Sequence, residues 1–146
     1  MSRQLKVSIE SEERAQRHDR LAVRPYLDIR SYFDGRRMLV EVSNEGLGIA
    51  IIKSAQLFID GNPLSVNEVA PAAVVLNALA FDQSHLVGKA SAFVVATDSA
   101  LRPGGSIVVV DIGLDGTYGY SHMKRLRLVA NYESLYGESF NLDWKV

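Results

Sequence analysis

The chain has 146 residues, of which 47% are hydrophobic and none is cysteine, and its formal net charge is −1. This length and composition allow one domain that buries its own core without a disulfide or a metal. The lack of cysteine excludes thiolate zinc sites and cysteine nucleophiles, and the nearly balanced charge argues against a protein that wraps nucleic acid.

The first residues, Met1–Val7, lead into a polar run before any apolar block that could form the core of a signal peptide. No stretch approaches the ~20 apolar residues of a membrane span, and the nearest, Ala70–Phe81, is too short. We therefore expect neither an export signal nor a membrane span in this sequence. Localisation stays open, with synthesis in the cytoplasm and a virion as one destination.

Residues 8–22 are rich in Glu, Arg and Gln and contain few apolar residues. Opposite charges at helical spacing, such as Glu10 and Arg14, stabilise a solvated helix slightly. We predict a charged helical arm over residues 1–24, which is either a solvated stub or the element that docks a protein partner or a second copy. The residues of the arm expected to contact that partner are Ile9, Arg14, Arg17 and Leu21.

After Pro25 the sequence pattern becomes alternating. Leu27, Ile29 and Phe33 are separated by polar residues, and Asp34–Gly35 follows them. This is typical of a half-buried strand that ends in a tight turn.

Two more strands are predicted over residues 38–42 and 49–60, joined by the glycine-rich turn Asn44–Gly48. The second strand ends in another tight turn, Asp60–Gly61. Such short connections favour antiparallel neighbours over crossover helices. The turn is not a phosphate cradle, because a strand follows its glycines where a helix N-terminus would be needed.

One helix is predicted over Ala72–Phe81, where alanines favour a helix and Pro71 stands near its start. Ser65 and Glu68 have the spacing of a capping box. A strand is the alternative for this segment, because residues 74–76 are a local apolar run.

The sequence that follows this helix predicts strands. Buried strands are expected over residues 92–97 and 107–112, on either side of the turn Arg102–Gly105. A hairpin is expected from residues 125–132 and 140–144, joined by residues 133–138. Its inward-facing residues are predicted to be Leu126, Leu128, Ala130, Tyr132, Phe140, Leu142 and Trp144.

About seven short strands and one inserted helix predict an immunoglobulin-like antiparallel β-sandwich, mainly β, over residues 25–146. The residues assigned to its structural turns are Asn44, Gly46, Gly48, Asp60, Gly61, Gly104, Gly105 and Gly137.

The polar residues that chemistry would require form no recognisable set. His18, His85 and His122 lie far apart in the sequence, without the spacing of metal ligands. Asp82, Ser84 and His85 have the residue types of a hydrolase triad but are too close together on one loop to align. We therefore predict no catalytic, cofactor-binding or metal-binding residues, and no enzyme.

Two weaker binding hypotheses remain. Asp111, Asp115 and Asp143 would hold calcium only if loops brought them together, and the segment around Asp115 lacks the ligand pattern of an EF-hand. Tyr118, Tyr120 and Tyr136 lie in or beside loops, where tyrosines stack on sugars, bind partners or simply pack.

The segments Asn44–Lys53, Asp60–Gly61 and Tyr132–Gly137 resemble turn motifs of a loose group of uncharacterised bacterial membrane-tethered proteins. In that group a membrane helix continues into a charged stalk and then a β-sandwich. This sequence has Ile49 where the group usually has proline, and it shows no membrane helix. The resemblance implies no activity.

From the sequence we expect a non-catalytic structural or interaction subunit of a larger assembly, such as a decoration or connector protein of a phage or virion. The first alternative is the soluble domain of a membrane-associated bacterial envelope protein. The second is a module that binds carbohydrate or another small ligand through its loop tyrosines.

Overall fold

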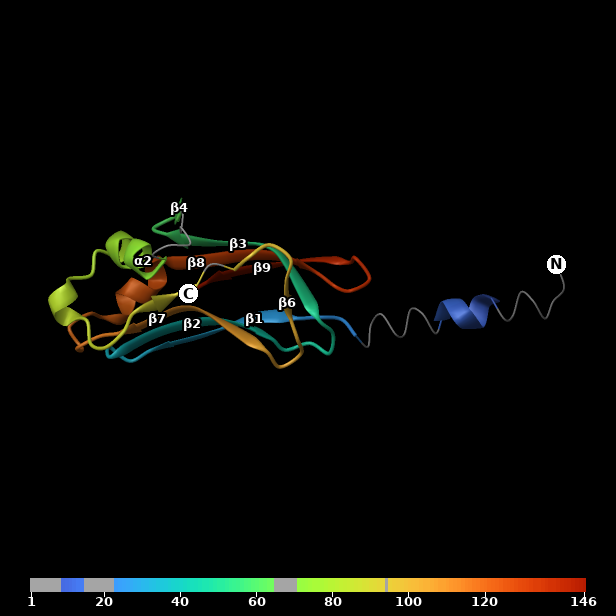
Figure 1. Cartoon of the computed structure of the whole chain (residues 1–146), viewed down its shortest axis with the longest axis horizontal. Helices are drawn as coiled ribbons and strands as arrows, with labels where there is room; N and C mark the ends of the chain where they lie inside the picture. Colours follow the sequence, from blue (N-terminus) through green and yellow to red (C-terminus); the bar gives the residue numbers. More distant parts are fainter. Residues whose placement is uncertain (1–8, 15–22, 65–70, 94) are drawn as a thin grey trace.

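The computed structural model describes residues 9–14, 23–64, 71–93 and 95–146 (Figure 1). Within these residues the fold is mainly antiparallel β, with strands in two sheets that pack face to face. The first sheet has the order β1 (Leu27–Phe33), β2 (Arg37–Asn44), β7 (Ser106–Gly113), β5 (Ser91–Ala92). The second has the order β4 (Asn62–Pro63), β3 (Ala50–Ile59), β8 (Leu126–Glu133), β9 (Ser139–Lys145), and β6 (Ser99–Leu101) also pairs with β3.

The core lies between the two sheets and follows the period-two alternation of the strands. In β8 the residues predicted to face inward, Leu126, Leu128, Ala130 and Tyr132, are all buried, which confirms that prediction. Met38, Val40 and Val42 of β2 are buried on the opposite sheet. Trp144, which the alternation also placed inside, is only half-buried, because β9 is the edge strand of its sheet.

The helical prediction for residues 72–81 is confirmed by α2 (Pro71–Leu79), whose Val75 and Leu79 are buried in the core. The helix ends two residues earlier than expected because Ala80 adopts a positive φ of 56°. The proposed capping residues Ser65 and Glu68 lie outside the described residues. Two short 3₁₀ helices, η1 (Gln83–His85) and η2 (Tyr120–Arg125), were not predicted.

The strand predicted over residues 92–97 is wrong for most of its length. β5 ends at Ala92, and the chain leaves that sheet and joins the other one at β6. The apolar run misled the prediction because Phe93 belongs to this crossing, where its side chain is 57% exposed.

Residues 9–14, in the middle of the predicted arm, are helical and all exposed. Arg17 and Leu21 lie outside the described residues. None of the helices in the described part of the chain is long and apolar enough to cross a membrane.

The sandwich has two unlike ends (Figure 1). At the arm end, on the right of the figure, residues 23–26 contact the β2–β3 turn and the β8–β9 hairpin, and Asn44 at the end of β2 bonds to the turn at residues 102–105. At the helix end, on the left, α2, η1 and η2 gather. These two names are used below.

Candidate functional site

Asn44 is the polar centre of the arm end. The side chain is fully buried, and its Nδ2 donates to the carbonyl oxygens of Gly48 (2.8 Å) and Leu101 (2.9 Å). Its Oδ1 accepts from the backbone N–H groups of Tyr26 (3.2 Å) and Gly46 (3.0 Å). One amide therefore satisfies four backbone groups from three separate segments.

The two glycines of the β2–β3 turn allow the backbone of residues 23–26 to pack directly against the turn. Neither Gly46 nor Gly48 has a positive φ. A Cβ on Gly48 would collide with the carbonyl oxygen of Val23, and one on Gly46 would meet the backbone of residues 24–26. Glycine is therefore required at these two positions because a side chain would not fit, and not because the backbone needs a positive φ.

Arg24 ties the start of the sandwich to two loops. Its carbonyl oxygen accepts from the N–H groups of Leu47 (3.1 Å) and Gly48 (3.3 Å). Its guanidinium lies over the ring of Phe140, 5.2 Å from the centroid, and its Nη2 is 3.4 Å from Glu138 Oε2. Although the arm prediction included residues 23 and 24, both contact the sandwich.

Around these contacts the arm end presents large apolar side chains to solvent. The exposed fractions are 76% for Leu47, 64% for Leu135, 59% for Tyr26 and 53% for Tyr136. They come from the β2–β3 turn, the β8–β9 hairpin and the residue just before β1. Beside them lies an open hollow of about 450 Å³, bordered by Ile49, Ala100, Leu101, Arg102, Gly105, Ser106 and Ile107.

At the helix end, aromatic and imidazole rings pack against one another. The ring of Tyr118 lies 4.5 Å from that of Phe81, 5.0 Å from His122 and 5.7 Å from His85, measured between centroids. Its hydroxyl accepts from the backbone N–H of Asp82 (2.7 Å). The structure thus brings His85 and His122 to one tyrosine, although the sequence spacing showed no relation between them.

His85 is paired with a carboxylate. Its Nδ1 lies 2.7 Å from Asp115 Oδ2 and 3.2 Å from Thr117 Oγ1. Hydrogen bonds from the Thr117 hydroxyl, from His85 and from the Thr117 backbone lower the pKa of Asp115 to about 2. Ser84, the nucleophile of the rejected triad, only donates its N–H to Asp82 within a turn. The arrangement holds two loops together and presents no aligned nucleophile.

Arg125 links the C-terminus of α2 to the β3–β4 turn at the helix end. Its guanidinium makes a paired contact with Asp60 and donates to the carbonyl oxygens of Leu79 (2.8 Å) and Ala78 (3.2 Å), at the C-terminus of α2. The Arg125 hydrogen bond lowers the pKa of Asp60. Asp60 and Gly61 both have positive φ, as a tight β3–β4 hairpin turn requires.

The residues considered for calcium and sugar binding are not brought together. Asp111 pairs with Arg37, Asp143 with Arg127, and Asp115 with His85. Tyr118 and Tyr120 are at the helix end, where Tyr120 is 51% exposed, whereas Tyr136 is at the arm end. Among the described residues no group of three or more His, Cys, Asp or Glu side chains is arranged to hold a metal ion.

Gly104, Gly105 and Gly137 lie in turns at the arm end. Gly104 (φ 74°) and Gly137 (φ 79°) occupy the left-handed region, and Gly104 N–H donates to the carbonyl oxygen of Asn44 (2.8 Å). Ile9 and Arg14 are exposed in the helical segment of the arm. Sequence reasoning did not single out Leu47 and Leu135, each of which is an apolar residue inside a polar turn.

No family model matches the chain, and no curated protein matches it significantly. The resemblance to membrane-tethered proteins therefore stays a prediction.

Proposed function

We propose that this chain is a non-catalytic interaction subunit that assembles with a second copy of itself through the arm end. The observation that carries the proposal is that this end presents Leu47, Leu135, Tyr26 and Tyr136, each more than half exposed. Apolar surface of this kind gains free energy when a partner covers it.

The two sheets also fit an immunoglobulin-like sandwich. The orders β1-β2-β7-β5 and β4-β3-β8-β9 correspond to strands ABED and C′CFG of that architecture. In such sandwiches the loops at one end form recognition surfaces. The β2–β3 and β8–β9 connections of this chain hold the equivalent positions, which supports recognition at the arm end.

A second copy is favoured as the partner because the charges of the chain complement each other. The described helical part of the arm carries Glu10, Glu12 and Glu13 together with Arg14, and Arg102 borders the hollow at the arm end. The acidic stretch from Glu10 to Glu13 of one copy would then lie in the hollow of another, although residues 1–24 as a whole carry more Arg and Lys than Asp and Glu. Attraction between such exposed charges is screened by salt.

The test compares particle mass by light scattering over a concentration series at low and high salt. The full chain is expected to associate, and the double variant Leu47→Ser, Leu135→Ser is expected to associate less at both salt concentrations. Removal of residues 1–21 is expected to abolish the salt dependence.

The matched control is Val87→Ser, which changes a side chain that is 58% exposed near the helix end. It should associate like the unaltered chain. A monomeric full chain at every concentration would overturn the proposal, and so would an equal loss in the control.

A further inference from the structure

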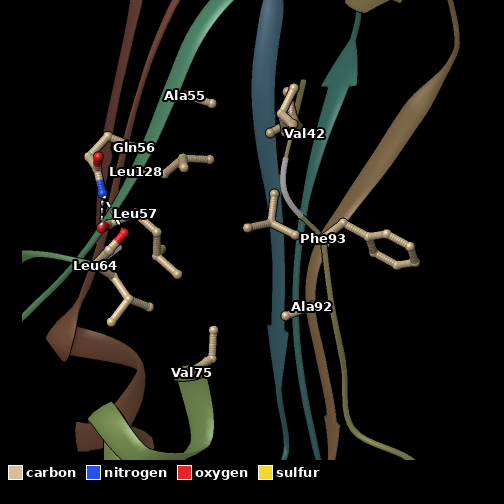
Figure 2. A pocket seen from close by; sticks show the side chains of 11 residues that line it. Val42, Ala55, Gln56, Leu57, Leu64, Val75, Ala92, Phe93 and Leu128 are labelled. Carbon is tan, nitrogen blue, oxygen red and sulfur yellow. Dashed lines mark hydrogen bonds between the residues drawn. The ribbon is translucent and has the colours of Figure 1, made fainter. Parts of the chain in front are cut away.

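A cavity of about 220 Å³ lies between the two sheets. Figure 2 shows Val42 and Ala92 on one wall, Ala55, Leu57 and Leu128 on the other, and Val75 of α2 at the floor. Val42, Val75 and Leu128 are each at most 2% exposed, so the inner part of the cavity is closed off from solvent. Protein interiors rarely leave voids much larger than a water molecule, so this one is a candidate binding site.

The cavity exists because the edges of the two sheets are incomplete at this point. β5 and β4 have two residues each, and the last hydrogen bond of this segment to the first sheet is that of the Phe93 N–H to the carbonyl oxygen of Val109 (3.1 Å). Phe93 turns its ring away from the cavity in Figure 2 and is 57% exposed. A side chain large enough to fill the space therefore stands at its border but outside it.

The size and shape of the cavity restrict its occupant. An apolar cavity of ~150 Å³ is known to take up benzene, and drug-sized ligands need about 300 Å³ or more. Two packed sheets are only ~10 Å apart, so a partner's helix, itself ~10–12 Å wide, cannot enter between them. An unbranched aliphatic chain of medium length fits both the volume of the cavity and the narrow space between the sheets.

Gln56 is the only polar residue among the described residues that line the cavity, and we use its side chain to infer the head group of the ligand. Gln56 Nε2 donates to the carbonyl oxygens of Leu57 and Leu64, both at 2.9 Å. Since a carboxamide nitrogen has two protons, the side chain has only its oxygen left to offer a ligand. An oxygen acceptor binds a hydroxyl group and repels a carboxylate.

We propose that this cavity binds a single aliphatic chain of medium length whose head group is uncharged and donates a hydrogen bond, as in a fatty alcohol. This site is separate from the arm end and does not depend on the assembly proposed above.

The test is an NMR titration of the full chain with 1-octanol and with octanoate at neutral pH. Octanol is expected to shift the methyl signals of Val42, Val75 and Leu128, and octanoate to bind more weakly. Ala55→Leu places extra carbons in the cavity and should weaken octanol binding by about tenfold or more, since each displaced methylene removes part of the hydrophobic gain.

Ala100→Leu is the matched control, because Ala100 is exposed at the hollow of the arm end. It should bind octanol like the unaltered chain. If Ala55→Leu lowers the melting temperature, Ala92→Leu fills the cavity from the opposite sheet and replaces it in the comparison.

Three outcomes would overturn the proposal. The first is the absence of methyl shifts with octanol. The second is octanoate binding as tight as octanol binding. The third is octanol binding that appears only in Phe93→Ala, which would make the ring of Phe93 the natural occupant of the cavity.

Discussion

At the arm end the loops are held mainly by backbone groups and one buried amide, with the Arg24 side chain as an added contact to the β8–β9 hairpin, whereas at the helix end they are held by charged and aromatic side chains. Asn44 and the carbonyl oxygen of Arg24 satisfy the backbone of the arm end. The helix end depends on Arg125, on the pair His85–Asp115 and on the rings around Tyr118.

This difference supports the proposal that the arm end is the end that meets a partner. Because main-chain contacts hold the arm end, side chains such as Leu47 and Leu135 have no structural task there and are exposed. At the helix end the residue types that suggest chemistry already pair with one another. Candidate residues for function are therefore better sought where the fold does not use the side chains.

The largest expected effect is at the arm end, in Asn44→Ala. This change removes the partner of four backbone groups, and at about 1 kcal/mol for each lost hydrogen bond the free energy of unfolding should fall by about 4 kcal/mol. Urea denaturation measures it.

The control for this change is Asn131→Ala, on the exposed face of β8, where the amide donates to Ser54 Oγ (3.0 Å) and accepts from Asn141 Nδ2 (2.8 Å), both in exposed contacts. Its effect should stay within about 0.5 kcal/mol. Equal losses in the two variants would mean that the arm end does not depend on its buried amide.

At the helix end, Arg125→Ala should lower the free energy of unfolding by about 2 kcal/mol, because two carbonyl oxygens at the end of α2 lose a charged donor. Arg127→Ala is the control. Arg127 also forms a paired contact with a carboxylate, Asp143, but both side chains are more than 40% exposed, so little change is expected. Thermal melting of both variants tests whether side-chain contacts stabilise the helix end.

Two truncations locate the boundary between the arm and the arm end. Removal of residues 1–21 should leave the stability unchanged. Removal of residues 1–24 should cost about 2 kcal/mol, because the N–H groups of Leu47 and Gly48 lose the carbonyl oxygen of Arg24. Chemical denaturation of the two shortened chains gives the difference. Identical curves would show that residues 23 and 24 belong to the arm.

The smallest expected effect is the loss of stability at low pH through Asp115. The folded-state pKa of Asp115, at about 2, lies below its usual value, so its contribution to stability is fully present above about pH 4 and is lost as the pH falls through about 2. The melting temperatures of the unaltered chain and Asp115→Asn should therefore differ at pH 5 and converge near pH 2.

A second variant tests the cause of this shift. Thr117→Val removes the hydroxyl that contributes most to it, so the carboxyl signal of Asp115 should titrate at a higher pH in an NMR experiment. An unchanged midpoint would show that the loop at the helix end does not rest on this contact.

The alternation of Leu126, Leu128, Ala130 and Tyr132 was enough to predict a half-buried strand, and the alanine-rich stretch after Pro71 was enough to predict a helix. The crossing after Ala92 was not predictable in this way. An apolar run is compatible with a strand in either sheet, and only the pairing of β6 with β3 shows where the chain goes.

The sequence by itself determined the local structure, because a strand's alternation and a turn's glycines depend on neighbours within a few residues. The tertiary structure decided which distant groups meet. Arg24 and Glu138 are 114 residues apart, Arg125 and Asp60 are 65 apart, and His85 and Asp115 are 30 apart. These contacts, the exposed arm end and the cavity between the sheets all follow from the register and stacking of the two sheets, which no single segment specifies.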